Sequence, residues 1–170
     1  RSICMHYGYG VTTNTTASLI ADLCSDGSRL PVYWTSLYSP CLGVFLPMFS
    51  QGTVPSRLAV GGEPPGDDAP WWLFRDLEKL ARKDIGFDAT IVSEVRAEWS
   101  SLQDELLDSA YAVSSEARGL IDAGQHAVAT GLLTKYMGST VARAIDIARG
   151  LASRLHSELL PASPSGGGPR

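Results

Sequence analysis

The sequence lacks any uninterrupted apolar run of the ~18 residues that a membrane-spanning helix needs, so no membrane association through such a helix is expected. It also lacks a basic stripe: 14 lysines and arginines stand against 18 acidic residues, for a net charge of −4. Nucleic-acid binding is therefore not expected. The opening residues contain no long apolar stretch of the kind found in a signal peptide. The chain has no initiator methionine, which indicates processing or a fragment of a longer protein.

Cysteine is scarce, with three residues at positions 4, 24 and 41. An odd number at wide spacing suits neither a disulfide framework nor a zinc site. We therefore expect buried thiols in a reducing, cytoplasmic compartment. A bridge between Cys4 and Cys24, or between Cys24 and Cys41, stays open as an alternative.

The sequence changes character near residue 65, and this change predicts an α+β fold in one domain. We expect antiparallel strands within residues 1–50, a loop over 50–67 and long amphipathic helices over 68–160. Residues 15–23 alternate between apolar and polar, residues 31–38 are β-branched and aromatic, and 41–49 form a further candidate strand. Asp26-Gly27 predicts the turn of a hairpin that joins Asp22 to Val32.

Apolar residues at spacings of three and four predict the helices. The first two expected helices cover 70–82, capped by Asp68 and ended by Gly86, and 88–120, capped by Asp88. A third covers 127–137, and the last restarts at Gly138-Ser139 and stops at Pro161. Trp71 and Trp72 are expected to clamp the first helix onto the sheet. The Pro/Gly/Ser-rich residues 161–170 are expected to be a disordered tail.

Several short stretches resemble, in order, the carboxy-terminal third of the C69 peptidase family, which includes bacterial dipeptidases and the secernins. The stretches are Ile3-Cys4-Met5-His6, Thr15–Ile20, Pro31–Trp34, Ser39–Pro47, Gly52–Pro55, Trp71–Phe74, Ala123-Gly124 and Leu132–Tyr136. The family is similar to the N-terminal nucleophile hydrolases, so the resemblance implies part of an αββα sandwich.

The resemblance also implies a reaction. In such enzymes a cysteine at the amino terminus attacks an amide carbonyl, and its own α-amino group acts as the base. No cysteine of this chain occupies that place, so the nucleophile is expected on an upstream segment of the same protein and the chain alone is expected to be inactive. The implied substrate is a small peptide or linear amide, and no metal or organic cofactor is implied.

Two other functions fit the same sequence. One is a non-catalytic, secernin-like scaffolding or regulatory protein that keeps the fold without hydrolysing anything. The other is an unrelated helical interaction domain that follows a small sheet. In each case a half-sheet with an exposed edge would tend to pair, so a homo-oligomer is one expected outcome.

The residues proposed to line a substrate cleft are His6, Asn14, Thr15 and Thr16, which the resemblance places near the family's site. For His6 the simpler interpretation is a histidine at a strand end, and for 14–16 it is turn chemistry before a strand. Residues 14–16 also form a glycosylation sequon, which matters only if the chain is secreted. Cys4 beside His6 could form a nucleophile pair, but a buried strand thiol is the favoured interpretation. His126 and His156 are expected on helices as surface or packing residues.

Overall fold

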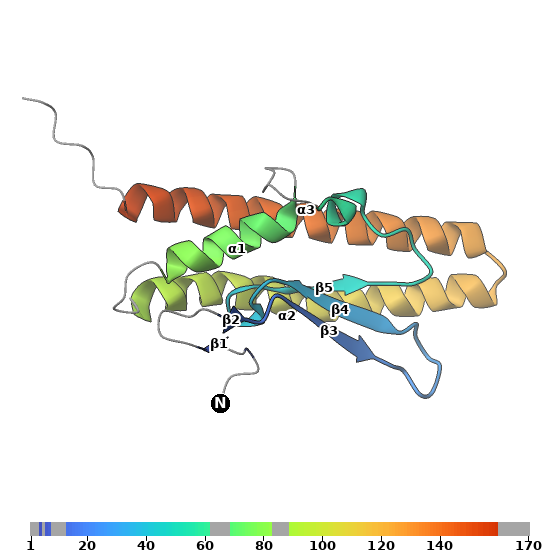
Figure 1. The fold of residues 1–170 in the computed structure, drawn as a ribbon. Coiled ribbons are helices and arrows are strands. Elements are labelled where there is room, and N and C mark those ends of the chain that lie inside the picture. Colours follow the sequence, from blue (N-terminus) through green and yellow to red (C-terminus); the bar gives the residue numbers. More distant parts are fainter. Residues whose placement is uncertain (1–3, 5, 8–12, 62–68, 83–88, 160–170) are drawn as a thin grey trace, which may run out of the picture.

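The computed structural model describes residue 4 and residues 6–7, 13–61, 69–82 and 89–159. Short strands come first and long helices follow, so the predicted α+β class is confirmed (Figure 1). The strands are β1 (His6–Tyr7), β2 (Thr13–Asn14), β3 (Ala17–Asp22), β4 (Val32–Leu37) and β5 (Phe45–Met48). The helices are α1 (Pro70–Ala81), α2 (Ala89–Asp122) and α3 (His126–Leu159), with short 3-10 helices η1 (Pro40–Leu42) and η2 (Ser56–Ala59). The predicted caps at Asp68 and Asp88, the end at Gly86 and the tail over 161–170 lie outside the described residues.

Strands β3, β4 and β5 form one antiparallel sheet in that order, and β1 pairs separately with β2. The predicted hairpin is confirmed, because Asp22 lies opposite Val32 and Gly27 takes the left-handed conformation with φ 70°. The prediction of a strand over 41–49 is wrong at its start. Pro40 opens a 3-10 turn there, closed by Leu42 N–H donating to the Ser39 carbonyl at 3.1 Å, and β5 begins at Phe45.

The far end of the β3–β4 hairpin is tied to α2 by polar contacts. Asp22 accepts hydrogen bonds from Arg29 and from the Tyr111 hydroxyl, each at 2.9 Å. The Arg29 guanidinium lies 4.5 Å from the centre of the Tyr111 ring. Ser114 on α2 donates to the Leu30 carbonyl at 2.7 Å. These contacts join the end of the hairpin to the second half of α2.

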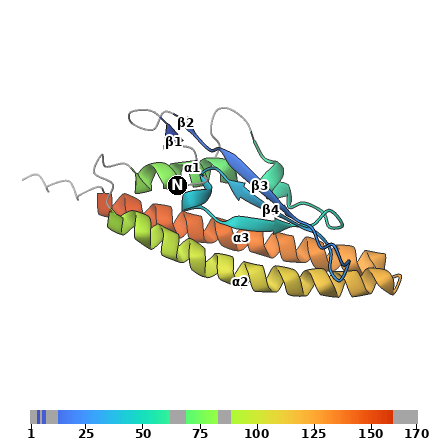
Figure 2. The ribbon, with the colours of Figure 1, turned by 90° about the horizontal axis from the view of Figure 1, so that it is seen from below.

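Helices α2 and α3 run side by side as a long antiparallel hairpin, with the sheet and α1 against them (Figures 1 and 2). Gly124 separates the two helices with φ 75°, as its break in the pattern predicted. The predicted restart at Gly138-Ser139 is wrong, because α3 continues through both residues. Packing along the whole helix outweighs the cost of one internal glycine. No helix in the described part of the chain has the length and apolar character to cross a bilayer.

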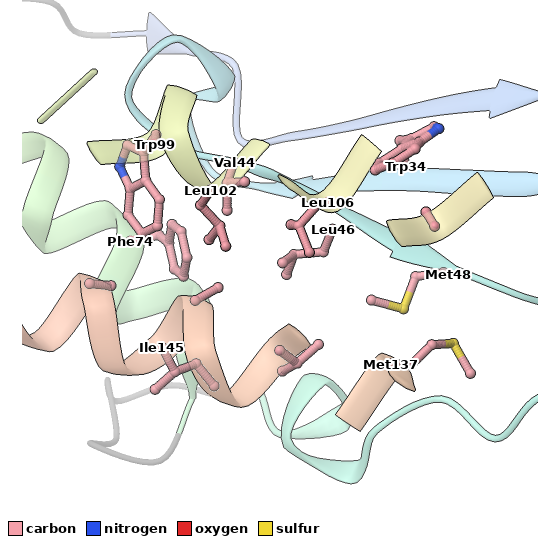
Figure 3. Packing of buried hydrophobic residues seen from close by; sticks show 14 of the residues in the cluster. Trp34, Val44, Leu46, Met48, Phe74, Trp99, Leu102, Leu106, Met137 and Ile145 are labelled. Atoms are coloured by element: carbon pink, nitrogen blue, oxygen red, sulfur yellow. The ribbon is translucent and has the colours of Figure 1, made fainter. Parts of the chain in front are cut away.

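The core lies between the sheet and the three helices (Figure 3). Leu46 of β5 is 2% exposed and packs near Leu106 of α2, while Met48 approaches Met137 of α3. Phe74 of α1 stacks on Trp99 of α2 with ring centres 5.5 Å apart. Strand β4 is thus the central strand, β5 is the edge strand that the helices cover, and β3 lies at the opposite, outer edge of the sheet (Figure 2).

Candidate functional site

A buried carboxylate on α1 organises a polar cluster beside the start of β3. Glu78 is 3% exposed, and its Oε1 atom accepts a hydrogen bond from the Asn14 amide at 3.0 Å. Arg82, one helical turn further on, lies 2.5 Å from the same oxygen. The Asn14 amide also reaches the Tyr38 hydroxyl at 3.5 Å. A buried charge is tolerated only when it is paired and hydrogen-bonded, and both conditions are met here.

The Thr16 carbonyl anchors the neighbouring turn. It accepts hydrogen bonds from the Tyr38 N–H at 3.1 Å and from the Trp71 indole N–H at 2.9 Å. The Trp71 and Tyr38 rings meet edge to face, with centres 5.2 Å apart. Tyr38 has φ 59°, a left-handed conformation that costs a non-glycine residue energy. The predicted clamp is therefore confirmed for Trp71, which holds α1 against the end of the sheet.

The four residues predicted to line a cleft have different surroundings. Asn14 is half-buried and belongs to the polar cluster, Thr15 is half-buried, and Thr16 is exposed and contributes its carbonyl. His6 is the register partner of Asn14 in the β1–β2 pair. The structure thus brings the backbone of these four positions to one end of the sheet. His126 and His156, expected on helices as surface or packing residues, are both exposed on α3.

Sequence reasoning missed Tyr38, Glu78 and Arg82. One signal was present for Glu78. It occupies the same helical face as Phe74, Leu77 and Ala81, where a carboxylate is unexpected unless it has a partner. Arg82 follows four residues later, at the spacing of an intrahelical ion pair. No sequence pattern links Asn14 to Glu78, because 64 positions separate them.

Two thiols meet on the other side of Arg82. The Cys41 N–H donates to the Cys4 sulfur at 3.1 Å, and the thiol of Cys41 is hydrogen-bonded to that of Cys4. Arg82 donates to the Cys41 sulfur at 3.2 Å, and Arg96 of α2 donates to the Cys41 carbonyl at 3.3 Å. Burial and the bond with Cys4 raise the pKa of Cys41 to about 11. Cys41 is therefore a neutral thiol near pH 7.

The cysteines differ from the prediction of three buried thiols. All three are thiols, but only Cys4 is fully buried, whereas Cys24 and Cys41 are half-buried. Cys4 lies in a bend before β1 and not inside a strand. Cys24 belongs to the hairpin turn, where it contacts Asp26 at 2.7 Å. That contact and the hydrogen bonds from Ser28 lower the pKa of Asp26 to about 2.

Within the described residues no strand pairs with the outer edge of β3, which we call its open edge. Gln103 of α2 bonds both the N–H and the carbonyl of Phe45, at 2.8 and 3.3 Å, so these groups face away from Ser36. Successive residues of an antiparallel strand direct their N–H and carbonyl groups to opposite sides, so those of Ser36 point toward Ser18 on β3. Along β3, the N–H and carbonyl groups of Leu19 and Ala21 therefore point outward, away from β4. The edge is also apolar on both faces: Leu19 is 65% exposed and its neighbour Ile20 is 50% exposed.

Comparison of the chain with models of protein families, with curated proteins and with solved structures found no match. Within the described residues, His, Cys, Asp and Glu side chains do not gather in a group of three that could hold a metal ion. The candidate site therefore consists of two neighbouring features: the polar cluster of Asn14, Tyr38, Glu78 and Arg82, and the open edge of β3.

Proposed function

We propose that this chain is the carboxy-terminal part of a dipeptidase-like cysteine amide hydrolase of the C69 type, acting on small peptides or linear amides. The nucleophilic cysteine of that enzyme lies on a segment that this chain does not include. One observation carries the proposal. A sheet of three strands ends in an edge whose N–H and carbonyl groups point outward between exposed apolar side chains, so it is built to receive a further strand.

The position of the polar cluster supports this function. Asn14 ends β2 and Thr16 directly precedes β3, so a strand added to the open edge would lie beside the segment that leads into the cluster. In the proposed enzyme that strand carries the nucleophile, and the amide of Asn14 and the hydroxyl of Tyr38 border the substrate. Such groups bond a peptide backbone and orient its scissile carbonyl without taking part in bond breaking.

The cysteines of the chain support a nucleophile located elsewhere. Nucleophilic attack requires a thiolate, which a raised pKa disfavours. Burial and the Cys4 contact keep the proton on Cys41, while Cys4 itself accepts a backbone hydrogen bond in a buried position. Both thiols therefore have surroundings that suit packing better than catalysis.

A second candidate, a non-catalytic secernin-like scaffold, is favoured by a different observation. Glu78 contacts both Asn14 and Arg82, so the buried carboxylate of the cluster already has partners. A scaffold would use the open edge of β3 to bind another protein and would need no nucleophile. The two functions make opposite predictions for the activity of the longer protein.

Activity measurements separate the two functions. The chain should hydrolyse none of a panel of dipeptides, and Cys4→Ala should change nothing. The longer protein that begins with a cysteine after processing should hydrolyse at least one dipeptide, and replacing that cysteine by alanine should abolish turnover. Turnover by the chain that disappears in Cys4→Ala would refute the hydrolase proposal. An inactive longer protein with no amino-terminal cysteine would favour the scaffold.

The open edge can be tested independently of catalysis. The solution mass of the chain, measured by light scattering, should rise with concentration as copies pair through β3. Leu19→Lys should abolish this association, because an edge lysine opposes strand pairing. Val128→Lys is the matched control, since Val128 is 55% exposed on α3, outside the sheet. Equal effects of the two lysines, or a wild-type chain that is monomeric at all concentrations, would remove the observation on which the proposal rests.

A further inference from the structure

Cys4 and Cys41 come from positions 37 residues apart, yet their side chains are in contact. Cys4 precedes β1, and Cys41 lies in η1, between β4 and β5. The Cys41 N–H donates to the Cys4 sulfur at 3.1 Å, and the two thiols are hydrogen-bonded to each other. Because the Cys4 sulfur lies against the Cys41 backbone, a bridge between the two side chains should need little backbone movement, which is the main requirement for a disulfide.

We propose that Cys4 and Cys41 form a reversible oxidation site, at which a low-molecular-weight disulfide such as glutathione disulfide converts the paired thiols into a bridge. This site is independent of the proposed hydrolase function. The bridge differs from both pairings that the cysteine spacing left open, because each of those involves Cys24.

The reaction balances without any further reagent. The Cys41 thiolate attacks one sulfur of glutathione disulfide, which breaks that S–S bond and releases one glutathione thiolate. Cys4 then attacks the Cys41 sulfur of the mixed disulfide and expels the second glutathione. Both protein sulfurs are oxidised, glutathione disulfide is reduced to two thiols, and the two protons lost by the cysteines end on glutathione.

The surroundings assign the order of attack. Cys41 lines a cavity of about 310 Å³ together with Pro40 and Arg96, so an outside disulfide can reach it, whereas Cys4 is 6% exposed. Arg82 and Arg96 favour the Cys41 thiolate, although burial opposes it more strongly. Oxidation should therefore be slow and specific, with Cys41 reacting first and Cys4 resolving the intermediate.

Oxidation would change two contacts. The bridge would join the residue before β1 to η1 covalently, so the β1–β2 pair would be tethered to the main sheet. The Cys41 sulfur would lose its proton, and with it the ability to exist as a thiolate beside Arg82. The oxidised chain should consequently unfold at a higher temperature, because the bridge restricts the unfolded state.

The test uses the wild-type chain in glutathione buffers that range from fully reducing to fully oxidising. Thiols are trapped with an alkylating reagent and mapped by peptide mass spectrometry. A peptide pair linked through Cys4 and Cys41 should appear, with a mass two hydrogen atoms below the sum of the two reduced peptides. Its amount should follow a single transition along the series of glutathione buffers and should return to zero on reduction. Cys24 should carry a single glutathione instead, because the contacts of its side chain are to Asp26 and Ser28.

The variants give the matched controls. Cys24→Ser should form the bridge as the wild-type chain does, whereas Cys41→Ser should leave Cys4 unmodified because the accessible thiol is gone. The same titration in urea should lose the preference for this pair. Bridges that include Cys24, separate glutathione adducts on Cys4 and Cys41, or thiols that stay reduced at the oxidising end would each overturn the proposal. Peptide mapping of the wild-type chain decides the outcome even if a variant fails to fold.

Discussion

Replacing Arg82 with methionine should destabilise the chain strongly, because it leaves a buried carboxylate without its cation. The Glu78 side chain is 5% exposed, and Arg82 lies 2.5 Å from its Oε1 atom. Methionine preserves the aliphatic part of the arginine and removes only the guanidinium. Among the described residues, the carboxylate would then keep the Asn14 amide at 3.0 Å as a hydrogen-bond donor, which is too little compensation for a charge away from water.

The expected magnitude follows from the burial of the pair. Breaking a buried ion pair by removing one partner costs about 3–5 kcal/mol. For a chain of this size each kcal/mol lowers the melting temperature by roughly 2–4 °C, so the melting temperature should fall by roughly 6–20 °C. Urea denaturation followed by circular dichroism measures the free energy of unfolding. If the slope of this free energy against urea concentration is the same in the wild-type chain and the variant, the change lies in stability and not in the compactness of the unfolded state.

Two comparisons make this prediction strict. Arg118→Met breaks an ion pair of the same spacing with Asp122, but its side chains are 42% and 56% exposed, so the cost should be below about 1 kcal/mol. The double variant Glu78→Leu/Arg82→Met removes both charges and should recover most of the loss. If Arg82→Met costs no more than Arg118→Met, or if the double variant is no more stable than the single one, the account of Glu78 as a buried, compensated charge is wrong.

Three further predictions concern the sheet and its contacts. Gly52→Ala should destabilise the chain by about 1–3 kcal/mol, because a Cβ there would lie 3.0 Å from the Leu133 Cβ. The matched control Gly131→Ala, which has open space around it in α3, should stabilise the chain by up to ~1 kcal/mol. Equal shifts of the melting temperature in the two variants would contradict this. Gln103→Ala should cost about 1–3 kcal/mol in urea denaturation, since the N–H and carbonyl of Phe45 lose their partner; a cost near zero would show that water replaces it. Hydrogen bonding from Arg29 lowers the pKa of Asp22, so the ionised carboxylate stabilises the fold above its ordinary pKa of 3.8, and this stabilisation is lost as the pH falls through the lowered pKa. Asp22→Asn should therefore have a lower free energy of unfolding at neutral pH, and that free energy should fall less steeply in acid. Identical profiles of unfolding free energy against pH for the two proteins would refute the assignment.

Local patterns were sufficient for much of the fold. The period-two alternation before Asp22 predicted β3, and the turn at Asp26-Gly27 predicted its hairpin with β4. Pro70 and the spacing of apolar residues after it predicted α1, and Gly124 predicted the break between α2 and α3. These signals act within a few residues of the chain, so they can be read without knowing what packs against them.

The same local reasoning failed where distant residues decide the outcome. Gly138 would weaken an isolated helix, yet α3 continues through it because Val141 and Ile145 beyond it pack into the core. The spacing of the cysteines favoured thiols without bridges and left open only bridges to Cys24, whereas the fold brings Cys4 to Cys41. The cleft prediction included Asn14 but not Glu78, its partner 64 residues away.

The sequence alone determined the class of the fold, the order of strands before helices and the position of the main turns, because periodicity, glycine and proline act through local sterics. The tertiary structure alone decided that Glu78 lies buried against Arg82, that Cys4 contacts Cys41 and that β3 is an open edge while β5 is covered. These features depend on which surfaces meet when α2 and α3 pack on the sheet. The free energy that selects that packing is summed over the whole core, so no short stretch of sequence contains it.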